Sequence, residues 1–434
     1  MKKTVIPIVA LVLLSLSLGA QGQGQQRRPQ APPVPPKGSQ VENVEITTRV
    51  GDVCQLVETV KLTAKSKKAL KGLKASDFDI VGNVGDGYFA KGGGQLQEFA
   101  DDGIVMTKKG KTVTLTVTPF NKNGNNRRPW EVHCTNADLN FSGADVDKTN
   151  IDIIDDCIHG TFTYAGLTRE YMLYLPKDKN GNVIKNVPLL VWQIGGGEYD
   201  RDMMTVALAN RCLVSLPTEG VPCATLVFAL ANPNYSYSAS LDPEKIKLID
   251  RNNALQMAFI DTLIKDGTVD GSKLFCSGAS SGGGCTMRFM MQFPDRFKAA
   301  VPCCAMDPII PIHQVKEKYD GQFADDLEKA FKGQVYKWNG SDMVLSDIDV
   351  KAFVKLPLFF VHAEADNTCK VISSKAYFEA RRRLGAKDDK IQIFDEDYMM
   401  SYGVGGFISH FSWVPLLDDF SEGTAMDWLV KKMK

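Results

Sequence analysis

The stretch at residues 273–288 constrains the chain more than any other. A short apolar run at 274–276 predicts a buried strand, and a turn with the pattern Gly-x-Ser-x-Gly, centred on Ser280, follows it. A helix-forming run then continues to Phe293 and stops at Pro294. Strand, Gly-x-Ser-x-Gly and helix in this order is the context in which the pattern indicates a nucleophile elbow. We therefore predict that Ser280 is a catalytic nucleophile and not part of a structural turn.

The chain from about residue 149 onward alternates apolar runs with runs of helical spacing. Predicted buried strands lie at residues 188–194, 223–231, 299–305, 356–361 and 391–394, a hairpin at 163–175, and helices at 246–264, 373–383 and 425–433. Buried strands that alternate with helices indicate a mostly parallel sheet. The sequence therefore predicts an α/β domain over residues 149–434.

The region at residues 41–148 has the signals of an all-β unit instead. Residues 112–118 alternate strictly, which places Val113, Leu115 and Val117 on one face of a strand. Further β-rich runs are separated by Gly-rich turns. We predict a small antiparallel sandwich, which is a structural or docking module because no nucleophile and base occur together in it.

The N-terminus is predicted to direct export. Two lysines and an apolar run at 5–18 are typical of a secretory signal peptide, predicted to occupy residues 1–24. The apolar run is too short to span a bilayer comfortably, so we expect no stable membrane insertion after cleavage. Residues 25–40 are rich in Gln and Pro and are predicted to form an extended linker. The expected location is secreted or periplasmic.

Composition excludes some partners and permits disulfides. The formal net charge is zero, which argues against a nucleic-acid partner. The spacings of the ten cysteines and five histidines match no metal-binding pattern, so we expect no metal site. An exported protein with ten cysteines can form disulfides, and a bridge between Cys54 and Cys134 is one expectation. Cys276 and Cys285 are expected to be buried thiols.

A serine hydroxyl becomes a good nucleophile only when a base takes its proton, and the base is usually a histidine oriented by a carboxylate. Three histidines follow Ser280 in the chain. We predict His410 as the base, because it lies in a glycine-containing loop between the last predicted strand and the last helix. His362, at the end of a strand, is interpreted as a structural residue, and His313 as part of an insertion.

The carboxylate should follow the strand that ends at residue 361. Asp366 is the best-placed acid, and Glu364 is its local competitor. The acidic residues at 395–397 are more remote and are interpreted as a solvated turn.

Acyl transfer also needs hydrogen-bond donors for the tetrahedral oxyanion. Ser281 supplies a backbone N–H directly after the nucleophile. The glycines at 195–197, which follow a predicted strand, can supply another because they carry no Cβ. Gly196 is the first choice and Gly197 the second, with a simple turn as the alternative.

These residues resemble a known family. The motifs at 188–198, 278–283, 360–366 and 410–413 are similar to those of secreted esterases and predicted peptidases of the α/β-hydrolase superfamily, in the branch that carries an N-terminal immunoglobulin-like domain. The resemblance covers most of residues 41–434.

The resemblance implies an α/β-hydrolase fold preceded by an immunoglobulin-like sandwich. It also implies a triad of Ser280, Asp366 and His410, and esterase activity on small acyl esters without a cofactor. It further suggests that the front domain supports the active site.

The long connection at residues 306–355 is long enough to form a cap over the pocket. Its aromatic and proline residues would then line an acyl or aromatic pocket, and a plain packed insertion is the alternative; these residues are Pro308, Pro311, Tyr319, Phe323, Tyr336 and Trp338.

The sequence thus predicts a secreted serine carboxylesterase that acts on a small ester or an acylated glycan. A serine peptidase of the same fold and an acetyl or feruloyl esterase of polysaccharides remain alternatives. A different class, a catalytically weak binding protein on a hydrolase scaffold, is motivated by Ile194, Ala363 and Cys369, which depart from the usual pattern of the family.

Overall fold

The computed structural model describes residues 34, 36–52, 54–82, 97–98, 103–123, 129–231, 243–306 and 322–434. The predicted signal peptide at 1–24 and most of the predicted linker at 25–40 lie outside the described residues. These two assignments therefore stay predictions.

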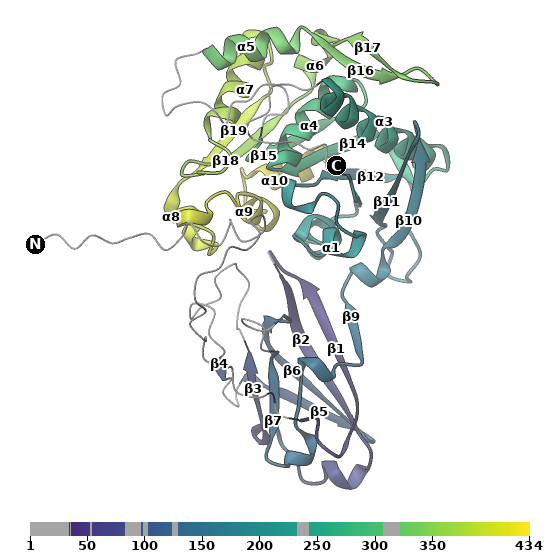
Figure 1. Cartoon of the computed structure of the whole chain (residues 1–434), viewed down its shortest axis with the longest axis vertical. Coiled ribbons are helices and arrows are strands. Elements are labelled where there is room, and N and C mark those ends of the chain that lie inside the picture. Colours follow the sequence, from purple (N-terminus) through teal and green to yellow (C-terminus); the bar gives the residue numbers. More distant parts are fainter. Residues whose placement is uncertain are drawn as a thin grey trace, which may run out of the picture. The chain divides into compact units, whose positions relative to one another are not determined.

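Two sheets make up the β-rich region (Figure 1). The first has the strand order β5-β6-β2-β1-β9 and the second the order β4-β3-β7-β8. The strands are β1 Val41–Val50, β2 Gln55–Ala64, β3 Phe78–Gly82, β4 Gln97–Glu98, β5 Val105–Lys109, β6 Thr112–Asn121, β7 Glu131–Cys134, β8 Phe141–Ser142 and β9 Lys148–Ile151. Short 3-10 helices connect them: η2 Lys67–Leu70, η3 Ala75–Asp77, η5 Ala137–Leu139 and η6 Gly143–Asp145. Described neighbours pair antiparallel except β1 and β9, which are parallel.

The two sheets share one hydrophobic core. On β6, Val113, Leu115 and Val117 are all buried, as their alternation predicts. Leu62 of the first sheet and Phe78 of the second belong to the same cluster of buried side chains. Two sheets around one core form a sandwich, so the predicted β-rich region is confirmed. Its immunoglobulin-like character stays a prediction, and the predicted boundary after residue 148 falls within β9.

The expected disulfide between Cys54 and Cys134 is wrong. The structure describes all ten cysteines, and none of them forms a disulfide. The N–H of Cys134 donates to the Asn140 side chain over 2.7 Å, and the Asn140 carbonyl accepts from Gly38, just before β1 begins. Cys54 lies beyond the other end of β1, a ten-residue strand. Such a strand spans about 30 Å, whereas the Cα atoms of a disulfide lie within about 7 Å of each other.

A separate, mostly parallel sheet of eight strands forms the centre of the α/β region. Its strand order is β10-β11-β13-β12-β14-β15-β18-β19. Strand β11 pairs antiparallel with both β10 and β13, and every other neighbouring pair in this order is parallel. The strands are β10 Ile158–Tyr164, β11 Leu167–Tyr174, β12 Val187–Gln193, β13 Ala224–Phe228, β14 Val269–Ala279, β15 Ala299–Cys303, β18 Phe359–Ala363 and β19 Lys390–Phe394. The predicted hairpin and the predicted parallel sheet are both confirmed.

Helices cover both faces of this sheet (Figure 1). Helices α3 and α4 lie on one side, and α1 and α10 lie on the other. The helices are α1 Met203–Ala207, α2 Ser215–Thr218, α3 Pro243–Lys265, α4 Ser281–Gln292, α5 Gln322–Phe331, α6 Val350–Lys355, α7 Ile372–Arg383, α8 Glu396–Ser401, α9 Trp413–Asp418 and α10 Ala425–Met433, with 3-10 helices η7 Ile154–Asp156, η8 Gly196–Glu198, η9 Arg211–Leu213 and η11 Gly406–Ile408. The predicted helices at 246–264, 373–383 and 425–433 correspond to α3, α7 and α10.

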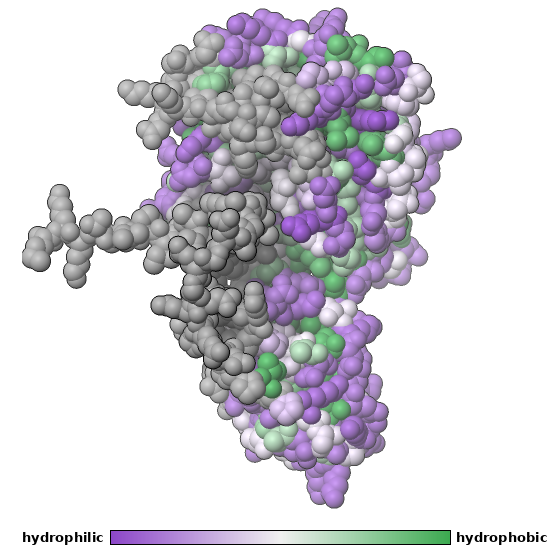
Figure 2. Space-filling model, viewed as in Figure 1, coloured by the Kyte–Doolittle hydropathy of each residue, from purple (hydrophilic) through white to green (hydrophobic). Residues whose placement is uncertain are grey.

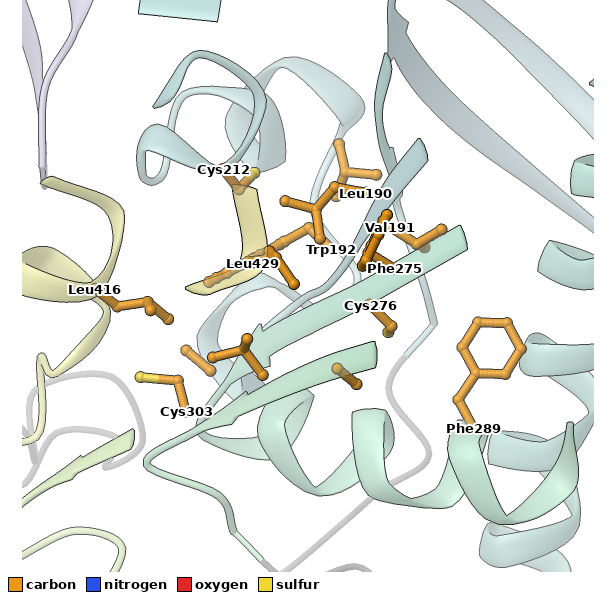
Figure 3. Packing of buried hydrophobic residues seen from close by; sticks show 14 of the residues in the cluster. Leu190, Val191, Trp192, Cys212, Phe275, Cys276, Phe289, Cys303, Leu416 and Leu429 are labelled. Atoms are coloured by element: carbon orange, nitrogen blue, oxygen red, sulfur yellow. The ribbon is translucent and has the colours of Figure 1, made fainter. Parts of the chain in front are cut away.

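The sheet and its helices bury a continuous apolar core. Figure 3 shows Leu190 and Trp192 of β12, Phe275 and Cys276 of β14, and Phe289 of α4 among its side chains. All five are at most 2% exposed, and Cys276 is a buried thiol as predicted. Burial of one large apolar side chain contributes about 1.5–3 kcal/mol. The core therefore fixes the ends of β12 and β14, where the predicted site residues lie.

The described part of the predicted insertion packs against helices of the α/β region. It consists of α5, the hairpin of β16 Gln334–Trp338 and β17 Met343–Asp347, and α6. The N–H of Tyr336 donates to Asp250 of α3 over 2.7 Å, and the Tyr336 carbonyl accepts from Gln292 of α4 over 2.7 Å. The Trp338 ring packs edge-on against Tyr164. Residues 307–321 lie outside the described residues. The described residues of this segment pack as expected for a plain insertion.

A buried ion pair connects the helices beneath this hairpin. Arg288 of α4 donates two hydrogen bonds to Asp250 of α3, over 2.7 and 2.6 Å. The Asp250 side chain is fully buried, and burial raises the pKa of its carboxyl while the Arg288 guanidinium opposes the shift. Removal of one partner would leave the other charge without compensation in a dry environment.

The described surface is of mixed polarity. Figure 2 shows hydrophilic and hydrophobic residues interspersed over the face that it displays. Among the described helices, none combines the length and the apolar character that crossing a bilayer requires.

Substitution of Asp250 by alanine should destabilise the fold strongly. The change leaves Arg288 buried and unpaired, so we expect the free energy of unfolding to fall by about 3–5 kcal/mol in urea denaturation. Asp261→Ala, which breaks the exposed pair with Arg296, is the matched control and should cost less than about 1 kcal/mol. Equal losses in the two variants would contradict the assignment.

Candidate active site

Ser280 forms a sharp turn between strand and helix. Strand β14 ends at Ala279 and α4 begins at Ser281, so Ser280 alone makes the connection. Its backbone has φ 58° and ψ −122°, a conformation that a residue with a Cβ rarely adopts. Ser280 is 9% exposed and lines a cavity. This is the geometry of a nucleophile elbow, at the position that the sequence predicts.

Three glycines allow the elbow to pack tightly. A Cβ on Gly278 would lie 2.6 Å from the Gln193 carbonyl oxygen, and a Cβ on Gly282 would lie 2.0 Å from the same atom. A Cβ on Gly283 would lie 2.4 Å from the Cys303 carbonyl oxygen. These separations are far below van der Waals contact, so only glycine fits beside β12 and β15. The sequence argument that side chains at these positions would clash is confirmed by these distances.

Asp366 lies in the loop after β18 and points inward. Its Oδ1 accepts the N–H groups of Thr368 and Cys369 over 2.8 and 2.9 Å, and its Oδ2 lies 2.7 Å from His410 Nδ1. Asp366 is 2% exposed, whereas its sequence competitor Glu364 is exposed. The structure therefore brings Asp366, and not Glu364, into contact with the predicted base.

The Asp366 carboxyl is held in its charged form. Burial by itself raises its pKa, but the hydrogen bonds from His362 and His410 outweigh burial and hold the pKa well below its ordinary value. A carboxylate of this kind can orient an imidazole ring and stabilise its positive charge without taking up the proton.

His362 fixes the loop that presents the acid. The residue is fully buried. Its Nε2 lies 2.7 Å from the Cys369 carbonyl oxygen and 3.3 Å from Asp366 Oδ2, and its Nδ1 lies 2.8 Å from Ser374 Oγ. Because a carbonyl can only accept, Nε2 carries a proton that it donates to the Cys369 carbonyl. These contacts match the structural role predicted for His362.

The loop that carries His410 is tied to its neighbours by side chains. The Ala363 N–H of β18 donates to Ser412 Oγ over 2.9 Å, which joins the acid strand to the base loop. Ser409 Oγ donates to the Glu396 carboxylate over 3.0 Å. The sequence predicts a solvated turn at residues 395–397, but the structure differs: Glu396 is the first residue of α8 and binds this loop.

Ser280 and His410, the predicted nucleophile and base, make no direct hydrogen bond with each other through their described side chains. Ser280 Oγ lies 3.8 Å from Cys369 Sγ, and the Ser280 N–H donates to the Cys303 carbonyl over 3.1 Å. Ser280 and His410 line the same cavity. Contacts between catalytic groups are often long before substrate binds, and rotation about the Ser280 Cα–Cβ bond can redirect the hydroxyl.

The predicted oxyanion donors border the elbow. We call residues 195–198 the glycine loop, which follows β12 and contains η8. A Cβ on Gly195 would lie 3.9 Å from Ser280 Cβ, and one on Gly196 would lie 3.9 Å from Ser281 Cβ. Gly197 lines the same cavity. Ser281 is the first residue of α4, so its N–H has no intrahelical acceptor.

Two residues next to these glycines were not predicted from the sequence. Glu198 accepts the Gly195 N–H at its side chain over 2.5 Å, and Tyr199 Oη lies 3.3 Å from Ser281 Oγ. Both line the cavity. The sequence offered one signal for Glu198, which is a glutamate directly after three glycines. A glutamate at that position can accept the N–H of the first glycine.

The cavity has a volume of about 420 Å³. Its remaining wall is largely apolar, and is formed by Ala209, Met306, Phe411 and Trp413, with Asn210 and Thr368 as polar members. The rings of Phe411 and Trp413 stack with centroids 4.5 Å apart, and Trp413 lies edge-on to the His410 ring. The volume and lining suit a small apolar group.

The other histidines lie apart from the cavity or outside the described residues. His133 pairs with Glu131 over 3.0 Å, and His159 pairs with Glu170 over 2.8 Å. Both pairs lie on strands and none of these residues lines the cavity. His313 lies outside the described residues.

One group in the described chain has the composition of a metal site. Ligand atoms of Cys304, Asp366 and His410 lie within 4.8 Å of one another. The Asp366 and His410 atoms are already paired with each other, and burial raises the pKa of the Cys304 thiol. Because metals bind the thiolate, a buried neutral thiol is a poor ligand, and the group is explained by the acid–base pair.

Comparisons with known proteins agree with this geometry. Residues 251–398 match the prolyl oligopeptidase family. A thermostable esterase of known structure has a TM-score of 0.58 and 21% identity to the chain, with coverage of 90% of this chain and 99% of that one. No curated protein sequence matches the chain.

Two further solved structures are similar over a smaller share. Est1E from Butyrivibrio proteoclasticus has a TM-score of 0.38 and 17% identity, and covers 63% of this chain and 97% of its own. A ferulic acid esterase has a TM-score of 0.42 and 16% identity, and covers 64% of this chain and 98% of its own. The family match and the fold together identify an α/β-hydrolase fold and a serine hydrolase.

Substitution of Gly282 by alanine should disrupt the elbow. The new Cβ would overlap the Gln193 carbonyl, and both backbone segments are held in place by the packed core. We therefore expect the free energy of unfolding to fall by about 3 kcal/mol or more. Gly197→Ala is the control, since nothing lies within 4 Å of its Cβ, and it should keep wild-type stability. A Gly282→Ala protein as stable as wild type in thermal and urea unfolding would refute the packing argument.

The stability that Asp366 contributes should depend on pH. Its pKa is lower in the folded protein than in the unfolded chain, so its ionised form stabilises the fold above the ordinary pKa, and this stabilisation is lost as pH falls toward the folded value. The stability deficit of Asp366→Asn, measured by urea denaturation, should therefore be larger at about pH 7 than at about pH 3. A deficit that is the same at both would show that ionisation is not involved.

Proposed function

We propose that this serine hydrolase is a carboxylesterase that cleaves short acyl or aryl esters through an acyl-enzyme. One observation carries the proposal: Ser280 at a strained turn, the Asp366–His410 pair and the glycine loop converge on a single cavity of about 420 Å³. Nucleophile, base, acid and backbone donors are the groups that acyl transfer requires.

In the first half of the proposed reaction, His410 takes the hydroxyl proton of Ser280 while Oγ attacks the ester carbonyl carbon. The tetrahedral intermediate collapses as His410 returns the proton to the leaving alcohol, which breaks the ester C–O bond. Asp366 stays ionised throughout, because its pKa lies well below its ordinary value. In the second half, water takes the place of the alcohol and releases the carboxylic acid and free Ser280.

The oxyanion is proposed to bind backbone N–H groups. Ser281 offers its N–H at the start of a twelve-residue helix, whose dipole favours negative charge at that end. Gly196 offers the second donor, with Gly197 as the alternative. Donors fixed before the reaction need no reorganisation when charge develops, which makes this one of the larger contributions to catalysis.

The lining of the cavity favours a small neutral acyl or aryl group. The apolar wall that includes Met306 and Trp413 can bury such a group, and no lysine or arginine lines the cavity among the described residues. An anionic ester would therefore find no counter-charge there. An acylated glycan fits if only its acyl group enters.

Peptide cleavage is the second candidate, because residues 251–398 match the prolyl oligopeptidase family. A peptidase must also protonate an amine and bind an extended chain. Matched p-nitrophenyl esters and p-nitroanilides of the same acyl group separate the two activities. Hydrolysis of the ester alone supports the carboxylesterase, and comparable hydrolysis of the anilide supports the peptidase.

Export of the enzyme remains a proposal that rests on the N-terminal sequence. N-terminal sequencing of protein expressed from the full chain tests it, with cleavage expected between residues 20 and 24.

Removal of the nucleophile or base should abolish turnover of p-nitrophenyl acetate, butyrate and octanoate. We expect Ser280→Ala and His410→Ala to lower kcat by about ten thousand-fold or more, because the triad acts as a unit. Ser272→Ala and His159→Ala are matched controls at exposed positions and should be as active as wild type.

Turnover that persists in Ser280→Ala would sink the elbow assignment. A folded wild type with no turnover, together with a bound glycan or protein whose binding survives Ser280→Ala, would favour the alternative of a binding protein on a hydrolase scaffold.

A further inference from the structure

Glu198 makes side-chain contacts that close the glycine loop on itself. Its Oε2 accepts the Gly195 N–H over 2.5 Å, and its own N–H donates to the Gly195 carbonyl over 3.1 Å. Its Oε1 accepts from Asn210 Nδ2 over 3.2 Å. The carboxyl group therefore binds the first residue of the loop and, at the same time, Asn210, which also lines the cavity.

Asn210 is itself fixed. It is 5% exposed, and its Oδ1 accepts the Cys212 N–H over 2.9 Å at the start of η9. Because Oδ1 is used in this way, the amide NH₂ must point toward Glu198. The glycine loop is thus connected through Glu198 to a rigid part of the core, since Cys212 is buried in the main hydrophobic cluster.

The glycines cannot supply this constraint themselves. Residues without a Cβ have wide conformational freedom and no side chain with which to pack. Around Gly197 nothing lies within 4 Å of the Cβ position. The direction of the loop N–H groups must therefore be set by contacts from outside the glycines, and Glu198 provides two of them.

We propose that Glu198 is a positioning residue that holds the N–H groups of Gly196 and Gly197 toward the oxyanion. The inference rests on the proposed function, because it assigns a role within the same acyl-transfer site. It goes beyond that proposal by naming the side chain that makes the oxyanion site rigid.

The role requires a hydrogen-bond acceptor and not a negative charge. A carboxylate beside an oxyanion would oppose the developing charge. Burial raises the pKa of Glu198 to about 7, while the Gly195 N–H opposes the shift. The neutral form is therefore populated near neutral pH, and it keeps a carbonyl oxygen that can accept from Gly195. A glutamine keeps an uncharged acceptor for the Gly195 N–H, but its NH₂ group meets the NH₂ of Asn210, so it restores one of the two side-chain contacts.

Three variants separate positioning from a general structural effect. Glu198→Ala should lower kcat for p-nitrophenyl acetate by about ten- to a hundredfold, somewhat less than the loss of an oxyanion donor itself. Its KM should change by less than about threefold, because the ground-state carbonyl makes little use of these donors. Glu198→Gln, which keeps the contact with Gly195 but not the one with Asn210, should restore part of kcat. Asp202→Asn is the control, since Asp202 only caps α1 on the exposed side, and it should match wild type.

A transition-state analogue gives the decisive readout. A trifluoromethyl ketone adds to the nucleophile and forms an oxyanion, so its Ki should rise in Glu198→Ala by the same factor by which kcat/KM falls. The inference would be overturned if Glu198→Ala kept the wild-type kcat and Ki. It would also be overturned if the variant lost activity only through a higher KM. If wild type itself shows no turnover that depends on Ser280, the proposed function fails instead, and the two failures are distinguished.

Discussion

The close approach of three glycine backbones to strands β12 and β15 is the contact on which the rest of the site depends. A serine with φ 58° is strained by about 1–3 kcal/mol, and such a residue persists only when its surroundings allow no alternative. Gly278, Gly282 and Gly283 provide those surroundings, because any side chain there would overlap a neighbouring carbonyl. This turn places Ser280 at the cavity. It also makes Ser281 the first residue of α4, so the Ser281 N–H has no intrahelical partner.

A second constraint is the buried charge of Asp366. An ionised carboxylate inside a protein is costly unless hydrogen bonds replace the lost water. Asp366 receives backbone donors from Thr368 and Cys369 and lies within reach of both His362 and His410. These contacts draw together the end of β18, the loop after it and the loop before α9. The charge therefore orients His410, the predicted base, even though it lies far from Asp366 in the chain.

The sequence predicted the parts of the site that depend on local pattern or chain order. The pattern Gly-x-Ser-x-Gly between a strand and a helix pointed to Ser280. The chain order of nucleophile, acid and base predicted that Asp366 and His410 lie near one another. The alternation of Val113, Leu115 and Val117 located one face of the sandwich. Each of these rests on periodicity or on the way parallel strands end at one edge of a sheet.

The remaining features depend on contacts between distant segments, which pattern cannot supply. The pairing of Asp250 with Arg288 and Tyr336 shows how the described insertion packs, but nothing local to Asp250 marks its partners. The expectation of a Cys54–Cys134 bridge was wrong because the register of β1 places them at opposite ends of a ten-residue strand. Glu198 was missed because its role depends on Asn210, twelve residues away.

The most direct test of the central claim is to locate the covalent adduct of a fluorophosphonate on the purified enzyme by mass spectrometry. Trypsin should release residues 274–288 as one peptide, which contains three serines and two cysteines. The account predicts stoichiometric labelling at Ser280, with loss of ester hydrolysis in proportion. A label on Ser277, Ser281 or a cysteine, or full hydrolysis by protein labelled at Ser280, would contradict it.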